Sequence, residues 1–345
     1  MKPSTSFRKA SADMNNVHNR FLLLALLLVC SAAIVPLAAF IGMKIITPAM
    51  ISGSAFDHDI FWKLRVPRVL AAFLAGSGLA LCGTVFQALF RNPLADPFTL
   101  GTASGAACGA AITILAAMGG SFFGMPFISI GAFLGAGAAM AAVYGIASLN
   151  RRSSNLTILL SGIAVSFLFS SMLMFLQYMS SLRDSFQIIR WLMGGIEVAG
   201  YSSLVTMLPF WVLGTLLILL QLPRLDQLLA GEDLAQSRGV NVARTKAVLL
   251  LATTLLIGGI VAVCGPIGFV GLVVPHFVRM CVGVDHRIVM ISSFLSGAIF
   301  LILCDTMAKT VAAPMELPVG VITGILGGIL FIYALMKKDL SMGGR

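Results

Sequence analysis

The chain has 345 residues, of which 59% are hydrophobic and only 10% are charged. Because a soluble domain carries about 25% charged residues, this composition excludes a globular surface and places the chain in a lipid bilayer. The net charge of +10 does not indicate a nucleic-acid partner, since the basic residues stand at the ends of apolar stretches and form no patch with exposed aromatic residues.

Ten apolar stretches follow one another along the chain and predict an all-α membrane protein with ten transmembrane helices, because a span needs about 20 apolar residues. They lie at 21–41, 69–90, 98–118, 125–148, 156–179, 202–222, 247–264, 266–282, 288–304 and 318–336. The eighth is short and holds Pro266 and Pro275, so we expect a broken or tilted helix there. The chain thus divides into a tail at 1–20, a transmembrane domain at 21–336 and a tail at 337–345.

The first stretch has the charge layout of a secretory signal, with Lys2, Arg8, Lys9 and Arg20 before it. An apolar core of a signal peptide usually has about 7 to 15 residues. The stretch at 21–41 is longer, so we expect it to remain as an uncleaved first span.

The distribution of basic residues predicts the orientation. With the N-terminus in the cytoplasm and ten spans, 16 of the 23 lysines and arginines fall on the cytoplasmic side. The positive-inside rule therefore places both termini and the connection at 222–246 in the cytoplasm. Merging the seventh and eighth spans would move the basic C-terminus outside, so ten spans are favoured over nine.

Two proline-containing motifs flank the second span. Arg65-Val66-Pro67-Arg68 stands before it, and Asn92-Pro93-Leu94-Ala95-Asp96-Pro97 follows it. The prolines of the second motif cannot continue a helix and bias the preceding residues toward extended backbone, so we expect a turn at the exit from the span.

The longest charged segment is the connection between the sixth and seventh spans, at 222–246. Its leucines recur near helical spacing, and Gly231 and Gly239 divide it into two short helical pieces. On chemistry alone it is either a solvated loop with buried leucines or a pair of short helices that lies in a groove of a cytoplasmic partner.

These motifs, together with GPIGFVGLVVPH at 265–276, Arg279 and WLMGG at 191–195, resemble the FecCD-type permeases of bacterial ATP-binding cassette (ABC) importers for iron-siderophores, haem and cobalamin. The resemblance runs from Arg65 to the C-terminus. It implies a multi-pass permease subunit of the bacterial inner membrane that passes a bulky metal chelate from a periplasmic binding protein. The other implied partners are a second permease copy or close relative and two cytoplasmic ATP-binding cassette subunits.

The resemblance also implies roles for residues near the cytoplasm. In this family the connection after the sixth span is the coupling loop that docks on the ATPase subunit, and four residues match its pattern: Gly231, Glu232, Ala235 and Gly239. By family position, Ser154 and Asn155 fall at the cytoplasmic gate. The alternative for that pair is an ordinary helix N-cap, which serine and asparagine favour.

Three basic residues on the outer side stand against the charge bias: Arg65, Arg68 and Lys309. In the cobalamin-type members, basic residues at these places receive acidic groups of the binding protein. Lys309 offers a point charge where such a member has arginine, which forms bidentate contacts. The alternative for all three is extension of the side chain toward lipid phosphates.

No chemistry is expected in the chain itself. It lacks the GxxxxGK[ST] loop that cradles phosphates, so it is not an enzyme, and ATP and Mg belong to the partner ATPase. Its cysteines form no CxxC pair, and we expect no cofactor or metal site. The alternatives for function are haem import by the same type of permease, or an ion-coupled secondary transporter. The latter needs carboxylates within the membrane, whereas Asp305 stands only at the end of the ninth span.

Overall fold

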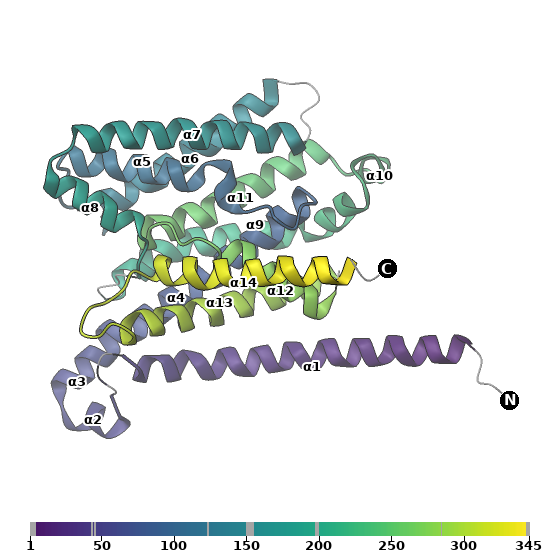
Figure 1. Cartoon of the computed structure of the whole chain (residues 1–345), viewed down its shortest axis with the longest axis horizontal. Coiled ribbons are helices and arrows are strands. Elements are labelled where there is room, and N and C mark those ends of the chain that lie inside the picture. The colour runs from purple at the N-terminus through teal and green to yellow at the C-terminus, as the bar shows by residue number, and fades with distance from the viewer. Residues whose placement is uncertain are drawn as a thin grey trace.

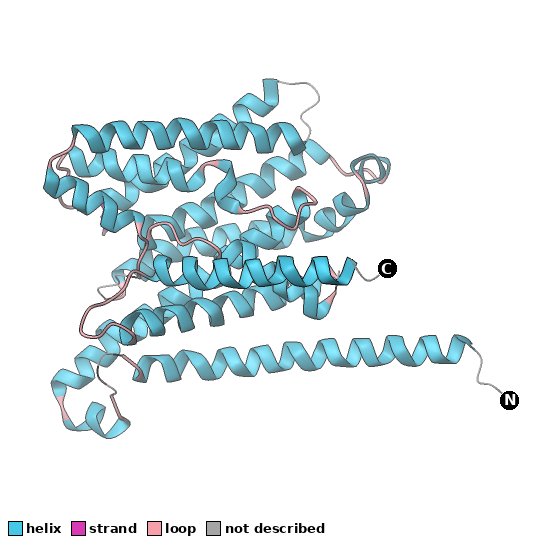
Figure 2. Ribbon diagram, viewed as in Figure 1, coloured by secondary structure: helices cyan, strands magenta, loops and turns pink. Residues whose placement is uncertain are grey.

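The computed structural model describes residues 5–342, except 43, 45, 123, 150–154, 197–199 and 284. Within them the chain is a bundle of long helices joined by short connections (Figures 1 and 2). The strands of this described part are β1 (Ser121–Phe122) and β2 (Met125–Pro126), which pair antiparallel between two helices. The all-α expectation is therefore confirmed.

Each of the ten predicted apolar stretches coincides with a helix. These helices are α1 (Thr5–Phe40), α4 (Val66–Leu89), α5 (Thr102–Leu115), α6 (Phe127–Leu149), α7 (Asn155–Met179), α9 (Ser202–Ala230), α11 (Val242–Cys264), α12 (Val270–Val282), α13 (His286–Thr310) and α14 (Val319–Met342). By length and composition, seven helices of the described residues are able to cross a membrane. The other three are shorter apolar helices: α5, α12 and the part of α14 at Val319–Ala334. Their crossing stays a prediction.

Several short helices join or extend the long ones. They are α2 (Pro48–Gly53), α3 (Ala55–Asp59), the π-helical η1 (Ile60–Arg65), the 3-10 helix η2 (Pro97–Leu100), α8 (Leu182–Leu192) and α10 (Glu232–Ser237). The segment η1 runs directly into α4, so the chain stays helical through the RVPR motif. Pro67 stands just after this π-helical segment, inside the continuous helical run Ala55–Leu89.

The connection at 222–246 is shorter than predicted. Helix α9 continues through Pro223 to Ala230, and α11 begins already at Val242. The first of the two predicted short helical pieces is therefore the end of α9, and the second is α10. The continuation is stabilised by burial, because Leu225 and Leu228 pack into the core.

Different helices and chain ends lie at the two ends of the bundle. The first residues of α1, the last residues of α14 and the whole of α10 lie at one end, on the right in Figure 1. Helices α2, α3 and α8 lie at the opposite end. We refer to these as the α10 end and the α8 end.

Glycines bring the helix backbones into direct contact. A Cβ atom added at Gly76 of α4 would collide with the carbonyl oxygen of Gly297 on α13, and one at Gly83 would collide with Gly271 on α12. In lipid, helices associate through close packing, since the surrounding acyl chains are as apolar as the side chains. The small residues of the sequence thus determine which helices are neighbours.

Helix α6 offers a matched pair of glycines to test this packing. A Cβ at Gly135 would collide with the carbonyl oxygen of Gly105 on α5, whereas a Cβ at Gly137 would meet no atom within 4 Å. We expect Gly135→Ala to destabilise the protein by about 1 to 3 kcal/mol, because neither backbone is able to move freely. Gly137→Ala should be neutral. Thermal unfolding of both variants in detergent checks this, and equal melting temperatures would contradict it.

Candidate functional site: two charged ends joined by one helix

Four charged side chains form a network at the α8 end. Arg68, in the first turn of α4, donates from Nε to Oδ1 of Asp305 at 3.0 Å and from Nη1 to Oε2 of Glu316 at 2.7 Å. Lys309 donates from Nζ to Oδ2 of Asp305 at 2.6 Å. Asp305 and Lys309 belong to α13, and Glu316 lies in the connection to α14. We call these four residues the charge network.

The network is mostly buried. The side chain of Asp305 is 2% exposed and that of Lys309 is 7% exposed, while Glu316 reaches 39%. Two positive and two negative charges compensate one another, as buried ions require. The structure thus brings together two of the predicted docking residues, Arg68 and Lys309, and directs their charges toward acidic residues of the same chain.

Arg65, the third predicted docking residue, makes different contacts. Its Nη1 donates to the backbone carbonyl of Phe40 at 2.9 Å, and its Nη2 donates to the carbonyl of Lys44. Both acceptors lie where α1 ends, so the guanidinium of Arg65 fixes the connection that follows α1. Neither Arg65 nor Arg68 is left extended toward lipid phosphates in this arrangement.

At the α10 end, two glycines with positive φ enclose α10. Gly231 has φ +142° and Gly239 has φ +83°, in a region that side chains rarely adopt. Between them Ala235 is fully buried, while Lys246 of α11 donates to Glu232 at 2.9 Å. A Cβ at Gly239 would meet no atom of the described residues within 4 Å, so the surface beside Gly239 is open.

The end of α4 contacts α7, which begins at the predicted gate residue Asn155, and α9, which leads to the predicted coupling residues. Asn155, the first residue of α7, donates from Nδ2 to the backbone carbonyl of Leu89 at 2.9 Å. Arg91, just after α4, donates to the carbonyl of Leu228 on α9. Ser154, the other predicted gate residue, lies outside the described residues. Asn155 therefore joins two helices, a role beyond an ordinary N-cap.

The turn after α4 is closed by Asp96, which lies between the spans. Its Oδ1 accepts from the backbone N–H of Phe98 at 3.2 Å and caps η2. Burial raises the pKa of the Asp96 carboxyl to about 6, although the hydrogen bond from Phe98 acts in the opposite direction. The proline-containing motif therefore forms a turn with its own internal hydrogen bond, as its prolines predict.

Sequence reasoning missed the acidic partners of the network. Asp305 was noted only as the end of a span, and Glu316 was given no role. The spacing of Asp305 and Lys309, four residues apart on one helix, was the available signal for their pairing. No such local spacing indicates that Glu316 pairs with Arg68, because the two residues are 248 positions apart in the sequence.

A bundle of apolar helices with charged residues gathered at its two ends is the architecture of a multi-pass membrane protein. The FecCD transport family matches residues 21–337. The chain therefore belongs to the FecCD transport family, and the resemblance seen in its motifs is confirmed.

Relatives agree with this assignment. The hemin transport system permease protein HmuU of Yersinia pestis is 39% identical over 297 residues, which cover 83% of this chain and 87% of that protein. The vitamin B12 import system permease protein BtuC of Salmonella typhi is 35% identical over 322 residues, which cover 92% of this chain and 95% of that protein. A solved inward-facing structure ascribed to a metal-chelate type ABC transporter matches with a TM-score of 0.83 and 29% identity, covering 91% of this chain and 98% of that one. The chain is an ABC transporter permease.

The charge network should depend most on its central carboxylate. Asp305→Asn leaves Lys309 buried without a carboxylate and should cost about 3 kcal/mol or more of stability. Glu316→Gln, at the exposed edge, should cost about 1 kcal/mol or less. Thermal unfolding in detergent compares the two variants. Combining Asp305→Asn with Lys309→Met should recover part of the loss, and strictly additive losses would contradict the coupling.

Proposed function

We propose that the chain is the membrane-spanning permease subunit of an ABC importer that passes a bulky metal chelate from a periplasmic binding protein across the bacterial inner membrane. The observation that carries this proposal is the family match over residues 21–337. Iron-siderophore or cobalamin is the proposed cargo, and the similarity to BtuC supports the latter. Haem is the second candidate, because HmuU is 39% identical and is named for hemin.

In this proposal all ten long or apolar helices cross the membrane, and the α10 end faces the cytoplasm. The excess of basic residues in the connections assigned to that side supports this orientation. The start of α1, the end of α14 and α10 share one end of the bundle, which supports assigning both termini and α10 to the same side of the membrane (Figure 1). A second permease copy or close relative completes the pathway.

Coupling to two cytoplasmic ATPase subunits is assigned to α10 and the glycines beside it. Gly231 and Gly239 allow a partner to approach the backbone, and Ala235 anchors α10 to the bundle. Glu232 joins α10 to α11 through Lys246. ATP binding and hydrolysis on the partner would then shift the equilibrium between outward-open and inward-open states, with Ser154 and Asn155 at the gate.

Docking of the binding protein is assigned to Arg65, Arg68 and Lys309 at the α8 end. Because Arg68 is already held by Asp305 and Glu316, an incoming acidic group would replace Glu316, the most exposed member of the network. Such contacts chiefly raise the rate of association. An ion-coupled transporter is less well supported, since Asp305 is occupied by two cations of its own chain.

A pair of glycine variants with the same backbone conformation tests the coupling assignment. Gly239 has φ +83° and Gly124, in the β1–β2 turn, has φ +78°. A Cβ added at either position would meet no atom of the described residues within 4 Å. Asparagine tolerates this conformation, so both Gly239→Asn and Gly124→Asn should fold. We expect Gly239→Asn to lower co-purification of the partner ATPase at least about tenfold, because a side chain would separate the two surfaces.

Gly124→Asn should retain the ATPase at the parental level. The measurement is the amount of ATPase that co-purifies with equal amounts of each variant, together with ATP hydrolysis by the complexes. Equal retention by Gly239→Asn and Gly124→Asn would remove Gly239 from the interface.

A further inference from the structure

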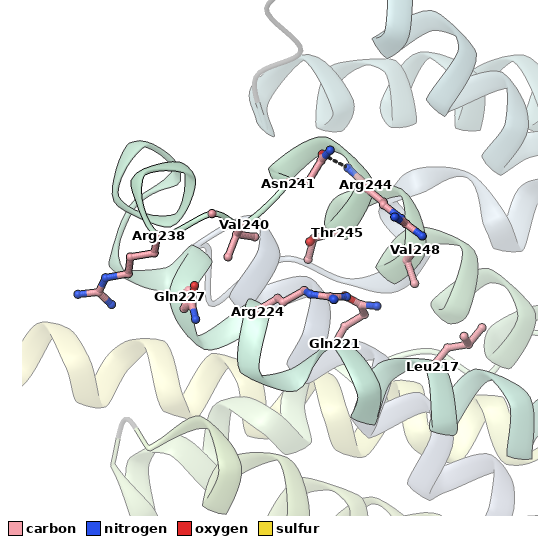
Figure 3. A pocket seen from close by; sticks show the side chains of 11 residues that line it. Leu217, Gln221, Arg224, Gln227, Arg238, Val240, Asn241, Arg244, Thr245 and Val248 are labelled. Atoms are coloured by element: carbon pink, nitrogen blue, oxygen red, sulfur yellow. Dashed lines mark hydrogen bonds between the residues drawn. The ribbon is translucent and has the colours of Figure 1, made fainter.

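A cavity of about 570 Å³ lies at the α10 end between the last turns of α9 and the first turns of α11. Three arginines line it, Arg224 on α9, Arg238 after α10 and Arg244 on α11, and no acidic residue does. Figure 3 shows that the side chains of Arg224 and Arg244 extend toward the side where Leu217 and Val248 lie, whereas Arg238 points away. We call this the arginine cavity.

The arginines of the cavity have no carboxylate partner among the described residues, although acidic residues stand nearby in the sequence. Asp226 pairs with Arg287 of α13, with 3.5 Å between Oδ2 and Nε. Glu232 accepts from Lys246 at 2.9 Å. Asp226 and Glu232 are thus engaged elsewhere, and the residues that line the cavity supply positive charge without a negative charge among them.

One of these arginines is oriented by a neighbouring amide. Arg224 donates from Nη1 to Oε1 of Gln221 at 2.8 Å, and Gln221 is itself buried. Arg244 stands in the first turn of α11, where Asn241 accepts from its backbone N–H at 3.0 Å. Guanidinium groups placed in this way present paired N–H donors, which suit phosphate oxygens.

The floor of the cavity continues into an apolar surface. Leu213 precedes Leu217 by one helical turn on α9, and Leu251 follows Val248 by one turn on α11. Leu213 is 47% exposed and Leu251 is 55% exposed, so both present apolar area further from the α10 end. A ligand that fits both regions has an anionic head and an apolar tail.

We propose that the arginine cavity binds the phosphate of an anionic phospholipid from the leaflet at the α10 end. Arg224 and Arg244 donate to the phosphate oxygens, and the acyl chains lie along Leu213 and Leu251. Basic pockets between membrane helices bind anionic headgroups in this manner. A soluble anion would make no use of the leucines, and an acidic segment of a partner protein would make little use of them. The site requires only that the chain lies in a bilayer, so its test is separate from transport.

The test compares lipid binding by three forms of the purified chain in detergent. The parent, Arg224→Gln with Arg244→Gln, and a control with Lys63→Gln and Arg183→Gln are titrated with phosphatidylglycerol or phosphatidylcholine of the same acyl chains. The control removes the same charge from η1 and α8, at the other end of the bundle. Bound lipid is counted by native mass spectrometry, and thermal unfolding verifies that the exposed substitutions leave the fold intact.

We expect the parent and the control to prefer phosphatidylglycerol about tenfold or more, and the cavity variant to lose this preference. An unchanged preference in the cavity variant would overturn the proposal. Displacement of the lipid by glycerol phosphate at equal concentration would overturn it in favour of a soluble-anion site. Co-purification of the partner ATPase is measured for the same three forms, and its loss from the cavity variant with the lipid preference retained would overturn the proposal in favour of an acidic partner segment.

Discussion

Direct contact between helix backbones is the constraint on which the rest of the structure depends. Lipid gives no hydrophobic gain for bringing apolar helices together, so close packing must supply the stabilisation. Gly76 and Gly83 of α4 meet Gly297 of α13 and Gly271 of α12. Among the long apolar helices of the described residues, α4 and the short helices before it form the most buried unit. The bundle is therefore built around α4, and glycines on α4 determine which helices pack against it.

The same helix joins the two charged ends. Its first turn holds Arg68 in the charge network, and its last turn offers the Leu89 carbonyl to Asn155 of α7. Arg91, beyond its end, binds the Leu228 carbonyl of α9. Polar contacts thus fix α4 to α13 at one end and to α7 and α9 at the other. A relative movement of these helices has to break or carry along hydrogen bonds at both ends of α4.

The positions of the helices were largely predictable, because apolar stretches, prolines and glycines act locally. The limits of α9 were not, since Pro223 favours a stop and only tertiary burial of Leu225 and Leu228 explains the continuation. The turn after α4 was predictable, since its prolines act on the adjacent backbone.

The charge network was not predictable as a unit. Arg68 is 237 residues from Asp305 and 248 from Glu316, and no local pattern connects them. Sequence reasoning singled out Arg68 and Lys309 as basic residues that oppose the charge bias, and their docking role stays a prediction. It gave no sign that acidic residues of the same chain contact both side chains. The arginine cavity is similar, because its charge is evident only once Asp226 and Glu232 are seen to pair elsewhere.

In the proposed function, another polypeptide supplies the energy for movement of a metal chelate through this chain. The most direct measurement is uptake of haem, cobalamin and a ferric siderophore into proteoliposomes that contain the chain alone or with its partner ATPase and binding protein. We predict uptake of one chelate only with both partners and ATP on the ATPase side, unchanged when proton and sodium gradients are collapsed. Uptake by the chain alone that follows an imposed ion gradient would contradict the account.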